Sequence, residues 1–174
     1  KLCKYVLHDQ YQPAAAFVPP MMPPYTSPEG LAYEVLFVDD DPNVTAALKR
    51  SLRREPYRIF SASCADEGLR VLENQPVDVL VTDEDMPGMP GSEFLEKVRR
   101  KYPRTIRIML TGRADLESTL RVAREGWIYR FFTKPCNDVD LGLSIRQALQ
   151  QRDLLELSAR LLERWRAQSA ATDA

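Results

Sequence analysis

The sequence predicts a doubly wound α/β fold, in which a parallel sheet is covered by helices on both faces. Two observations lead to this prediction. From residue 33 onward, short apolar runs alternate with segments whose apolar residues recur three and four positions apart. The apolar runs are nearly continuous, which is typical of strands buried on both faces. Because a parallel crossover needs a helix, the alternation indicates one domain of five strands and five helices.

The apolar runs give the positions of the predicted strands and the periodic segments give the helices. The strands are expected at residues 35–38, 59–60 with their flanks, 77–81, 106–110 and 128–132. The helices are expected at residues 44–54, 66–74, 93–102, 116–124 and 138–168.

Residues at the helix ends support this assignment. Asp41 is followed by Pro42, which places a capping carboxylate before a proline in the first turn. Ser63 and Ser92 are the predicted start residues of the second and third helices. Gly126 follows the fourth helix, where a left-handed cap is expected.

The charge balance argues against two classes of partner. The chain has 174 residues, with 24 Lys and Arg against 25 Asp and Glu and a formal net charge of -1. Proteins that coat nucleic acid or acidic membranes concentrate Lys and Arg, so we expect this segment to make no direct contact with nucleic acid or membrane. No run approaches the roughly 18 apolar residues of a membrane span, and the first residues lack the pattern of a secretory signal. We therefore expect a cytoplasmic protein.

Cysteine and histidine usage excludes several kinds of site. Cys3, Cys64 and Cys136 are an odd number with wide spacings, which fits neither a disulfide framework nor a metal knuckle. His8 is the one histidine in the sequence. A histidine-rich zinc site and a Ser-His-Asp triad are therefore both excluded.

Two segments flank the predicted domain, which spans residues 33–150. Residues 1–32 hold six of the 13 prolines, so we expect an extended, disordered tail or linker, with a docking peptide as the alternative. Residues 151–174 continue the last helix beyond the length needed to close the sheet. This helical extension carries a stripe formed by Leu154, Leu157, Leu161 and Trp165, widened by Leu155, Ala159 and Leu162. The stripe indicates a coiled-coil homodimer, packing on the chain's own domain, or packing on a further C-terminal domain.

Acidic residues follow two of the predicted central strands. Asp39, Asp40 and Asp41 follow the first strand, and Asp83 and Asp85 follow the third. The carboxyl ends of neighbouring parallel strands form the ligand-binding edge of such a sheet. Clustered carboxylates repel one another, and oxygen ligands of this kind favour Mg²⁺.

Two other strand ends carry residues suited to a phosphoryl group. Thr111 supplies a hydroxyl before Gly112, and Lys134 supplies a point charge after the last strand. A carboxylate nucleophile with metal-binding acids, a hydroxyl and a lysine describes a site that forms an acyl phosphate on aspartate.

With these residues in place, the sequence resembles the receiver domain of two-component response regulators, across residues 33–150. The segments that carry the resemblance are VLFVDDDP at 35–42, VLVTDEDMPGMPG at 79–91, LTG at 110–112 and FFTKP at 131–135. The resemblance implies a flavodoxin-like, five-stranded parallel sheet of order 2-1-3-4-5 with an extended C-terminal helix.

The resemblance also implies a role for individual residues. Asp83 matches the phosphoacceptor. Asp40 matches the main Mg²⁺ carboxylate, with Asp39, Asp83 and the backbone carbonyl of Asp85 as further ligands. Lys134 matches the lysine that pairs with the phosphoryl group, and the family has a cis peptide before the following proline.

Further implied roles concern signalling and phosphoryl lifetime. Thr111 and Phe131 match the hydroxyl and aromatic switch residues, which couple the site to the face formed by helix 4, strand 5 and helix 5. Asp85 and Arg113 match positions that flank the path of hydrolytic water, so we expect them to tune dephosphorylation. The lead-in IYRF at 128–131 resembles receivers attached to cyclic-dinucleotide phosphodiesterase or transcriptional-activator outputs.

The function implied is a signalling switch and not an enzyme acting on a separate substrate. A sensor histidine kinase or phosphotransfer protein would phosphorylate Asp83 with Mg²⁺, slow self-dephosphorylation would follow, and an output domain or effector protein would receive the signal. The alternative is a haloacid-dehalogenase-type phosphatase, because Asp83 and Asp85 also form that family's Asp-x-Asp pair. A receiver-like module that does not use phosphate is disfavoured, because the acceptor, metal acids, hydroxyl and lysine are all present.

Overall fold

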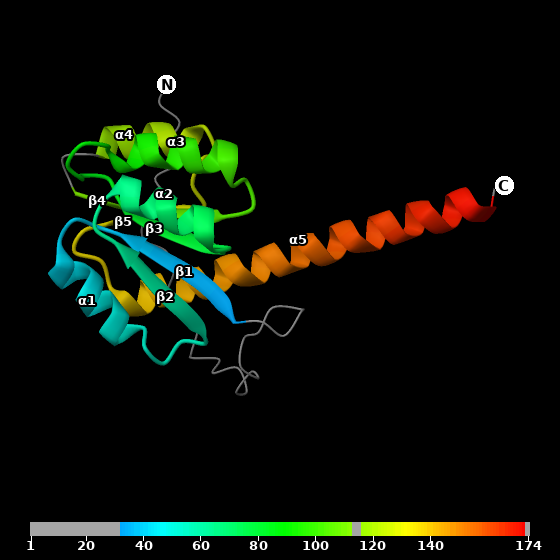
Figure 1. Ribbon diagram of the computed structural model, residues 1–174, viewed down its shortest axis with the longest axis horizontal. Helices are drawn as coiled ribbons and strands as arrows, with labels where there is room; N and C mark the ends of the chain where they lie inside the picture. Colours follow the sequence, from blue (N-terminus) through cyan, green and yellow to red (C-terminus); the bar gives the residue numbers. More distant parts are fainter. Residues whose placement is uncertain (1–31, 113–115, 173–174) are drawn as a thin grey trace, which may run out of the picture.

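The computed structural model describes residues 32–112 and 116–172 as a five-stranded parallel sheet flanked by helices (Figure 1). The strands lie in the order β2-β1-β3-β4-β5. Their bounds are β1 (Tyr33–Val38), β2 (Tyr57–Ala62), β3 (Val79–Asp83), β4 (Ile106–Thr111) and β5 (Arg130–Thr133). The helices are α1 (Pro42–Ser51), α2 (Ala65–Asn74), α3 (Gly91–Lys101), α4 (Leu116–Arg124) and α5 (Asp138–Thr172). The predicted fold class, strand order and long final helix are confirmed. Residues 1–31 of the predicted tail lie outside the described part.

The sheet is buried on both faces because successive side chains of its central strands point into different cores. Val35 and Phe37 of β1 pack in one core with residues of α1 and α5. Leu36 and Val38 of the same strand pack in the other, with residues of α2, α3 and α4. Figure 1 shows the same two helical layers on either side of the sheet. This burial explains why β1 and β3 appear in the sequence as continuous apolar runs.

The helix starts were predicted with mixed success. Asp41 is the N-cap of α1, and its Oδ1 accepts a hydrogen bond from the Asn43 amide at 2.8 Å. Gly126 has the expected positive φ of 69°. Ser63 is not the cap of α2, because Cys64 is. Ser63 instead donates from its amide and its hydroxyl to the Glu67 carboxylate, both at 2.7 Å.

The prediction for α3 was also wrong at its start. Pro90 is the N-cap, and it makes no side-chain capping bond. Ser92 therefore lies inside the first turn. The Ser92 amide donates to the carboxylate of Glu84, a residue outside the helix, at 2.6 Å.

A polar cluster fixes α5 to the amino ends of the central strands, and we call it the clasp: Tyr33, Asp78, Arg152 and Asp153. Arg152 forms an ion pair with Asp78 and lies 5.7 Å above the Tyr33 ring. The Tyr33 hydroxyl donates to Asp153, and Asp78 also accepts from the Glu34 amide at 2.6 Å. Burial, followed by the hydrogen bond to Asp153, raises the pKa of Tyr33. The clasp lies where α5 passes from its buried to its exposed portion.

Beyond the clasp, α5 continues without a break, and its apolar side chains face solvent in the described chain. The exposed apolar residues are Leu154, Leu155, Leu157, Leu161, Leu162 and Trp165, with exposures between 52% and 67%. Figure 1 shows this part of α5 projecting away from the sheet. These six side chains are therefore left largely uncovered by the described domain.

We predict that Arg152→Met weakens the attachment of α5. The substitution keeps much of the side-chain volume but leaves the Asp78 carboxylate with the Glu34 amide as its remaining donor among the described residues. Loss of a charged hydrogen bond of this kind costs about 2 kcal/mol of the free energy of unfolding. Urea denaturation measures this loss, and hydrogen exchange should be faster at residues 150–158. The exposed Arg164→Met is the matched control, and equal effects of the two substitutions would contradict the prediction.

Candidate functional site

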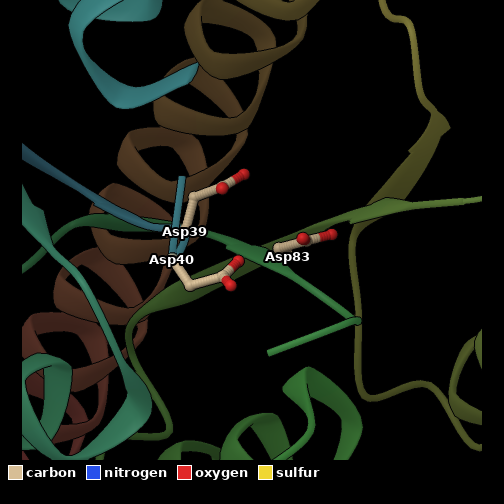
Figure 2. Close-up of side chains that lie close together, drawn as sticks. All are labelled: Asp39, Asp40 and Asp83. Carbon is tan, nitrogen blue, oxygen red and sulfur yellow. The ribbon is translucent and has the colours of Figure 1, made fainter. Parts of the chain in front are cut away.

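Three carboxylates meet at the carboxyl ends of β1 and β3. These strands are neighbours with Val38 paired to Thr82, so Asp39 and Asp83, the next residues along each strand, lie side by side. Asp40 follows Asp39, and each of the three side chains has an oxygen within 4.8 Å of the others (Figure 2). Asp39 and Asp83 are 3% and 4% exposed, whereas Asp40 is exposed to solvent. Two of the three carboxylates are therefore almost fully desolvated.

Lys134 lies between the two buried carboxylates. Its Nζ is 2.7 Å from Asp39 Oδ2 and 2.7 Å from Asp83 Oδ2. The Lys134 amide donates to the Thr111 carbonyl at 2.8 Å, and the Lys134–Pro135 peptide is cis, as the resemblance implied. Burial lowers the pKa of Lys134, but hydrogen bonds to Asp39 and Asp83 outweigh it and raise the pKa above its ordinary value. The lysine therefore stays charged at the centre of the site.

The Asp83 carboxylate has a partner for one of its two oxygens. Its Oδ2 is paired with Lys134, while its Oδ1 is buried and has no hydrogen-bond partner among residues 32–112 and 116–172. Burial raises the pKa of Asp83, and the nearby charge of Asp39 adds to this effect, while Lys134 opposes it. Three carboxylates surround one ammonium group, so negative charge is in excess. An all-oxygen site with this excess fits Mg²⁺.

The loop between β3 and α3 packs tightly against the backbone of Asp83. A Cβ atom at Gly91 would collide with the Asp83 carbonyl oxygen, so only glycine fits here. The Gly91 amide donates to the Glu84 carbonyl at 3.0 Å. Glu84 is 6% exposed, and its carboxylate accepts from the Ser92 amide at 2.6 Å. The close approach of α3 thus holds the position of Asp83.

Sequence reasoning missed the structural parts played by Glu84 and Gly91. In the sequence, Glu84 lies between Asp83 and Asp85, and nothing there distinguishes it from its acidic neighbours. The available signal was Pro90 before the helix, because proline offers no side-chain acceptor for the first amides of α3.

Thr111 and Phe131, the predicted switch residues, lie on the adjoining strands β4 and β5. Thr111 is fully buried, and its hydroxyl donates to the Gly112 carbonyl at 3.1 Å. Phe131 is half-buried and packs against the core that contains Met109, its partner across the strands. The Thr111 hydroxyl would have to rotate away from Gly112 to contact a group on Asp83.

Asp85 and Arg113 are the two residues predicted to tune dephosphorylation. The side chain of Asp85 is exposed, and Arg113 lies outside the described residues. The phosphatase alternative requires the Asp85 carboxyl to act beside Asp83, but in the described part of the chain the carboxylates that lie within 4.8 Å of one another are those of Asp39, Asp40 and Asp83. No helix among the described residues is both long enough and apolar enough to cross a membrane.

Comparison with known proteins agrees with this geometry. The family model described as the response regulator receiver domain matches residues 35–146. The hydrogenase transcriptional regulatory protein HoxA of Cupriavidus necator is 38% identical over 120 residues, covering 69% of this chain and 25% of HoxA. The transcriptional regulatory protein GlrR of Escherichia coli is 32% identical, covering 67% of this chain and 26% of GlrR. The chain thus spans about a quarter of the length of these relatives.

Several solved structures with the same fold are described as receiver domains. The signal receiver domain of an HD domain-containing protein from Pseudomonas fluorescens is 35% identical, with a TM-score of 0.66 and coverage of 70% of this chain and 97% of that one. A CheY-like response regulator receiver domain protein from Methanospirillum hungatei is 33% identical, with the same TM-score and coverage. The matched residues include the strand ends that carry Asp39, Asp83, Thr111 and Lys134. The chain therefore belongs to the response regulator receiver domain family.

Proposed function

We propose that this chain is the phosphoryl-accepting switch of a two-component system and that Asp83 is the acceptor. The observation that carries the proposal is the Asp83 carboxylate itself. It ends β3 at the ligand-binding edge of the sheet, it is paired with Lys134, and its second oxygen is buried without a hydrogen-bond partner in the described chain. The family match and the signalling relatives support the same function.

The chemistry is the transfer of a phosphoryl group from a donor to Asp83. A carboxylate oxygen of Asp83 bonds to phosphorus, and the bond from phosphorus to the donor breaks. That donor is the phosphohistidine nitrogen of a sensor kinase or phosphotransfer protein, or the acyl oxygen of a small acyl phosphate. Lys134 pairs with the phosphoryl oxygens, and Thr111 donates to one of them after rotating from Gly112. Slow hydrolysis of the acyl phosphate returns Asp83 to its resting state, and Asp85 and Arg113 tune the rate.

The residues that would hold Mg²⁺ are Asp39, Asp40, Asp83 and the backbone carbonyl of Asp85. Bound Mg²⁺ would neutralise negative charge on the phosphoryl oxygens during transfer. The three side chains already have oxygens within 4.8 Å of one another. Asp40 is exposed to solvent, whereas Asp39 and Asp83 are buried.

The signal passes from the site to the face formed by α4, β5 and α5 and then along α5. Movement of Thr111 frees space beside Phe131, which packs against the core that contains Met109 of β4 and Val122 of α4. An output domain or an effector protein receives the change. HoxA and GlrR are named as transcriptional regulatory proteins, which favours an output in gene regulation, with nucleic acid contacted outside this segment. The protein acts in the cytoplasm.

The exposed stripe on α5 supports a homodimer through a parallel coiled coil. Apolar side chains at Leu154, Leu157 and Leu161 follow the spacing of a heptad seam, and all three are more than half exposed in the single chain. Burial of such a stripe against a second copy removes this apolar surface from water.

Phosphorylation of Asp83 is tested by intact-mass measurement after incubation with acetyl phosphate and Mg²⁺. We expect the wild type to gain one phosphoryl group and Asp83→Asn to gain none, because the amide is not a nucleophile here. Asp138→Asn, a substitution outside the site, is the control and should behave as the wild type does. Equal labelling of wild type and Asp83→Asn would show that the acceptor is a different residue.

Binding of Mg²⁺ is tested by the stability of the unphosphorylated protein. At about 100 times the dissociation constant, Mg²⁺ should raise the free energy of unfolding by about 2.7 kcal/mol. Asp40→Asn should weaken this stabilisation, whereas Asp85→Asn should leave it unchanged because only the Asp85 carbonyl is a proposed ligand. Chemical denaturation at constant ionic strength measures both, and an equal response of Asp40→Asn and wild type would contradict the site.

The homodimer is tested by sedimentation equilibrium of the full chain. Leu161→Lys places a charge in the apolar stripe and should shift the protein toward the monomer mass. Glu163→Lys changes the charge more, but on the polar side of α5, and should leave the dimer intact. A wild type that sediments as a monomer at all concentrations would rule out this arrangement.

A further inference from the structure

We propose that Glu84 is a positioning residue for the phosphorylation site, acting through the backbone that carries Asp83 and Asp85. The inference rests on the proposed function, because it assigns a role in assembling that same site. Glu84 neighbours the acceptor in sequence, yet its side chain points to the start of α3, and its carboxylate is bonded there. Its contribution is to close the β3–α3 loop in a single arrangement.

The bonds of Glu84 connect three parts of the molecule. Its amide donates to the Leu110 carbonyl of β4 at 2.9 Å. Its carbonyl accepts from the Gly91 amide at 3.0 Å and from the Met86 amide at 3.2 Å. Its carboxylate accepts from the Ser92 amide at 2.6 Å. One residue thus joins β4, its own loop and the first turn of α3.

The carboxylate is needed because α3 has no cap of its own. The first amides of a helix lack partners within it, and Pro90 at the N-cap offers no side-chain acceptor. By contrast, α1 is capped by Asp41 at its own N-cap position. The negative charge of Glu84 is also favoured by the helix dipole at this end, which offsets part of the cost of burying it.

The effect reaches Asp83 through the contact of Gly91 with its carbonyl. Gly91 is so close to the Asp83 carbonyl oxygen that a methyl group would not fit between them. Release of Ser92 from Glu84 would let the start of α3 move, and the Asp83 backbone and the Asp85 carbonyl would lose their fixed positions. Within the described residues, Lys134 forms ion pairs with Asp39 and Asp83 and not with Glu84. Glu84 therefore acts by geometry and not by charge on the lysine.

If Glu84 acts by accepting a hydrogen bond from Ser92, variants that keep this acceptor should differ from variants that lose it. Glu84→Gln keeps an oxygen acceptor of the same length for Ser92 and should retain function. Glu84→Ala removes the acceptor, and Glu84→Asp keeps the charge on a side chain too short to reach. Loss of such a supporting contact typically lowers metal affinity or activity by roughly tenfold or more. Thr105→Ala is the matched control, because it removes a buried bond to the Val77 carbonyl at 2.9 Å, at the opposite end of the sheet.

The test measures Mg²⁺ affinity by calorimetry and the rate of phosphorylation by acetyl phosphate on the full chain. We expect Glu84→Ala and Glu84→Asp to weaken Mg²⁺ binding and slow phosphorylation, each roughly tenfold. Glu84→Gln should stay within about twofold of wild type, and Thr105→Ala should lose stability with both values unchanged.

Three outcomes would overturn the inference. They are wild-type affinity and rate in Glu84→Asp, equal losses in Glu84→Gln and Glu84→Asp, or an equal loss of affinity in Thr105→Ala. Glu84→Asp keeps the test valid if Glu84→Ala does not fold. If wild type is not phosphorylated at all, the proposed function fails, while the Mg²⁺ titration of the same variants still decides the role of Glu84.

Discussion

The site depends on one interaction, the placement of a single ammonium group between two carboxylates that have been removed from water. Asp39 and Asp83 lie on neighbouring strands, and Lys134 reaches both from the end of β5 at 2.7 Å. Without Lys134, two nearly buried charges of the same sign would face one another, which costs free energy in a medium of low dielectric constant. Even with it, negative charge remains in excess among these side chains. The protein therefore holds this arrangement at a cost in free energy.

The parallel sheet brings these side chains together, and the loop after β3 fixes the position of Asp83. Parallel strands end at the same edge, so residues separated widely in the sequence meet there without a long connecting segment. The loop after β3 must then turn sharply into α3, and its tight packing at Gly91 leaves little freedom for Asp83. A buried hydrogen bond from Ser92 to Glu84 completes the turn. The Asp83 carboxylate is held by its backbone as well as by its ion pair.

Most of the fold could be predicted from sequence because burial on both faces leaves a clear pattern. The strand positions, the helix α4 and the gathering of Asp39, Asp83 and Lys134 all follow from apolar runs and from what stands at their ends. The starts of α2 and α3 could not be predicted in the same way. Local capping rules selected Ser63 and Ser92, but the first turn of α3 is capped by Glu84, a residue brought there by the fold. A contact of this kind has no periodic signature, and an acid in an acidic run gives no sign that it will be buried.

The clasp gives α5 a mechanical property that its sequence alone does not reveal. At about 1.5 Å per residue, the helix from Arg152 to Thr172 is a stiff arm of about 30 Å, fixed at one end by Asp78 and Tyr33. A tilt of about 5° at the fixed end would displace the far end by about 3 Å, comparable to a small helix shift at an allosteric interface. Adjustments in the receiver too small to alter its packing therefore become displacements that a partner could distinguish. The rigidity of the clasp, and not only the length of the helix, determines how much of such a tilt reaches the end of α5.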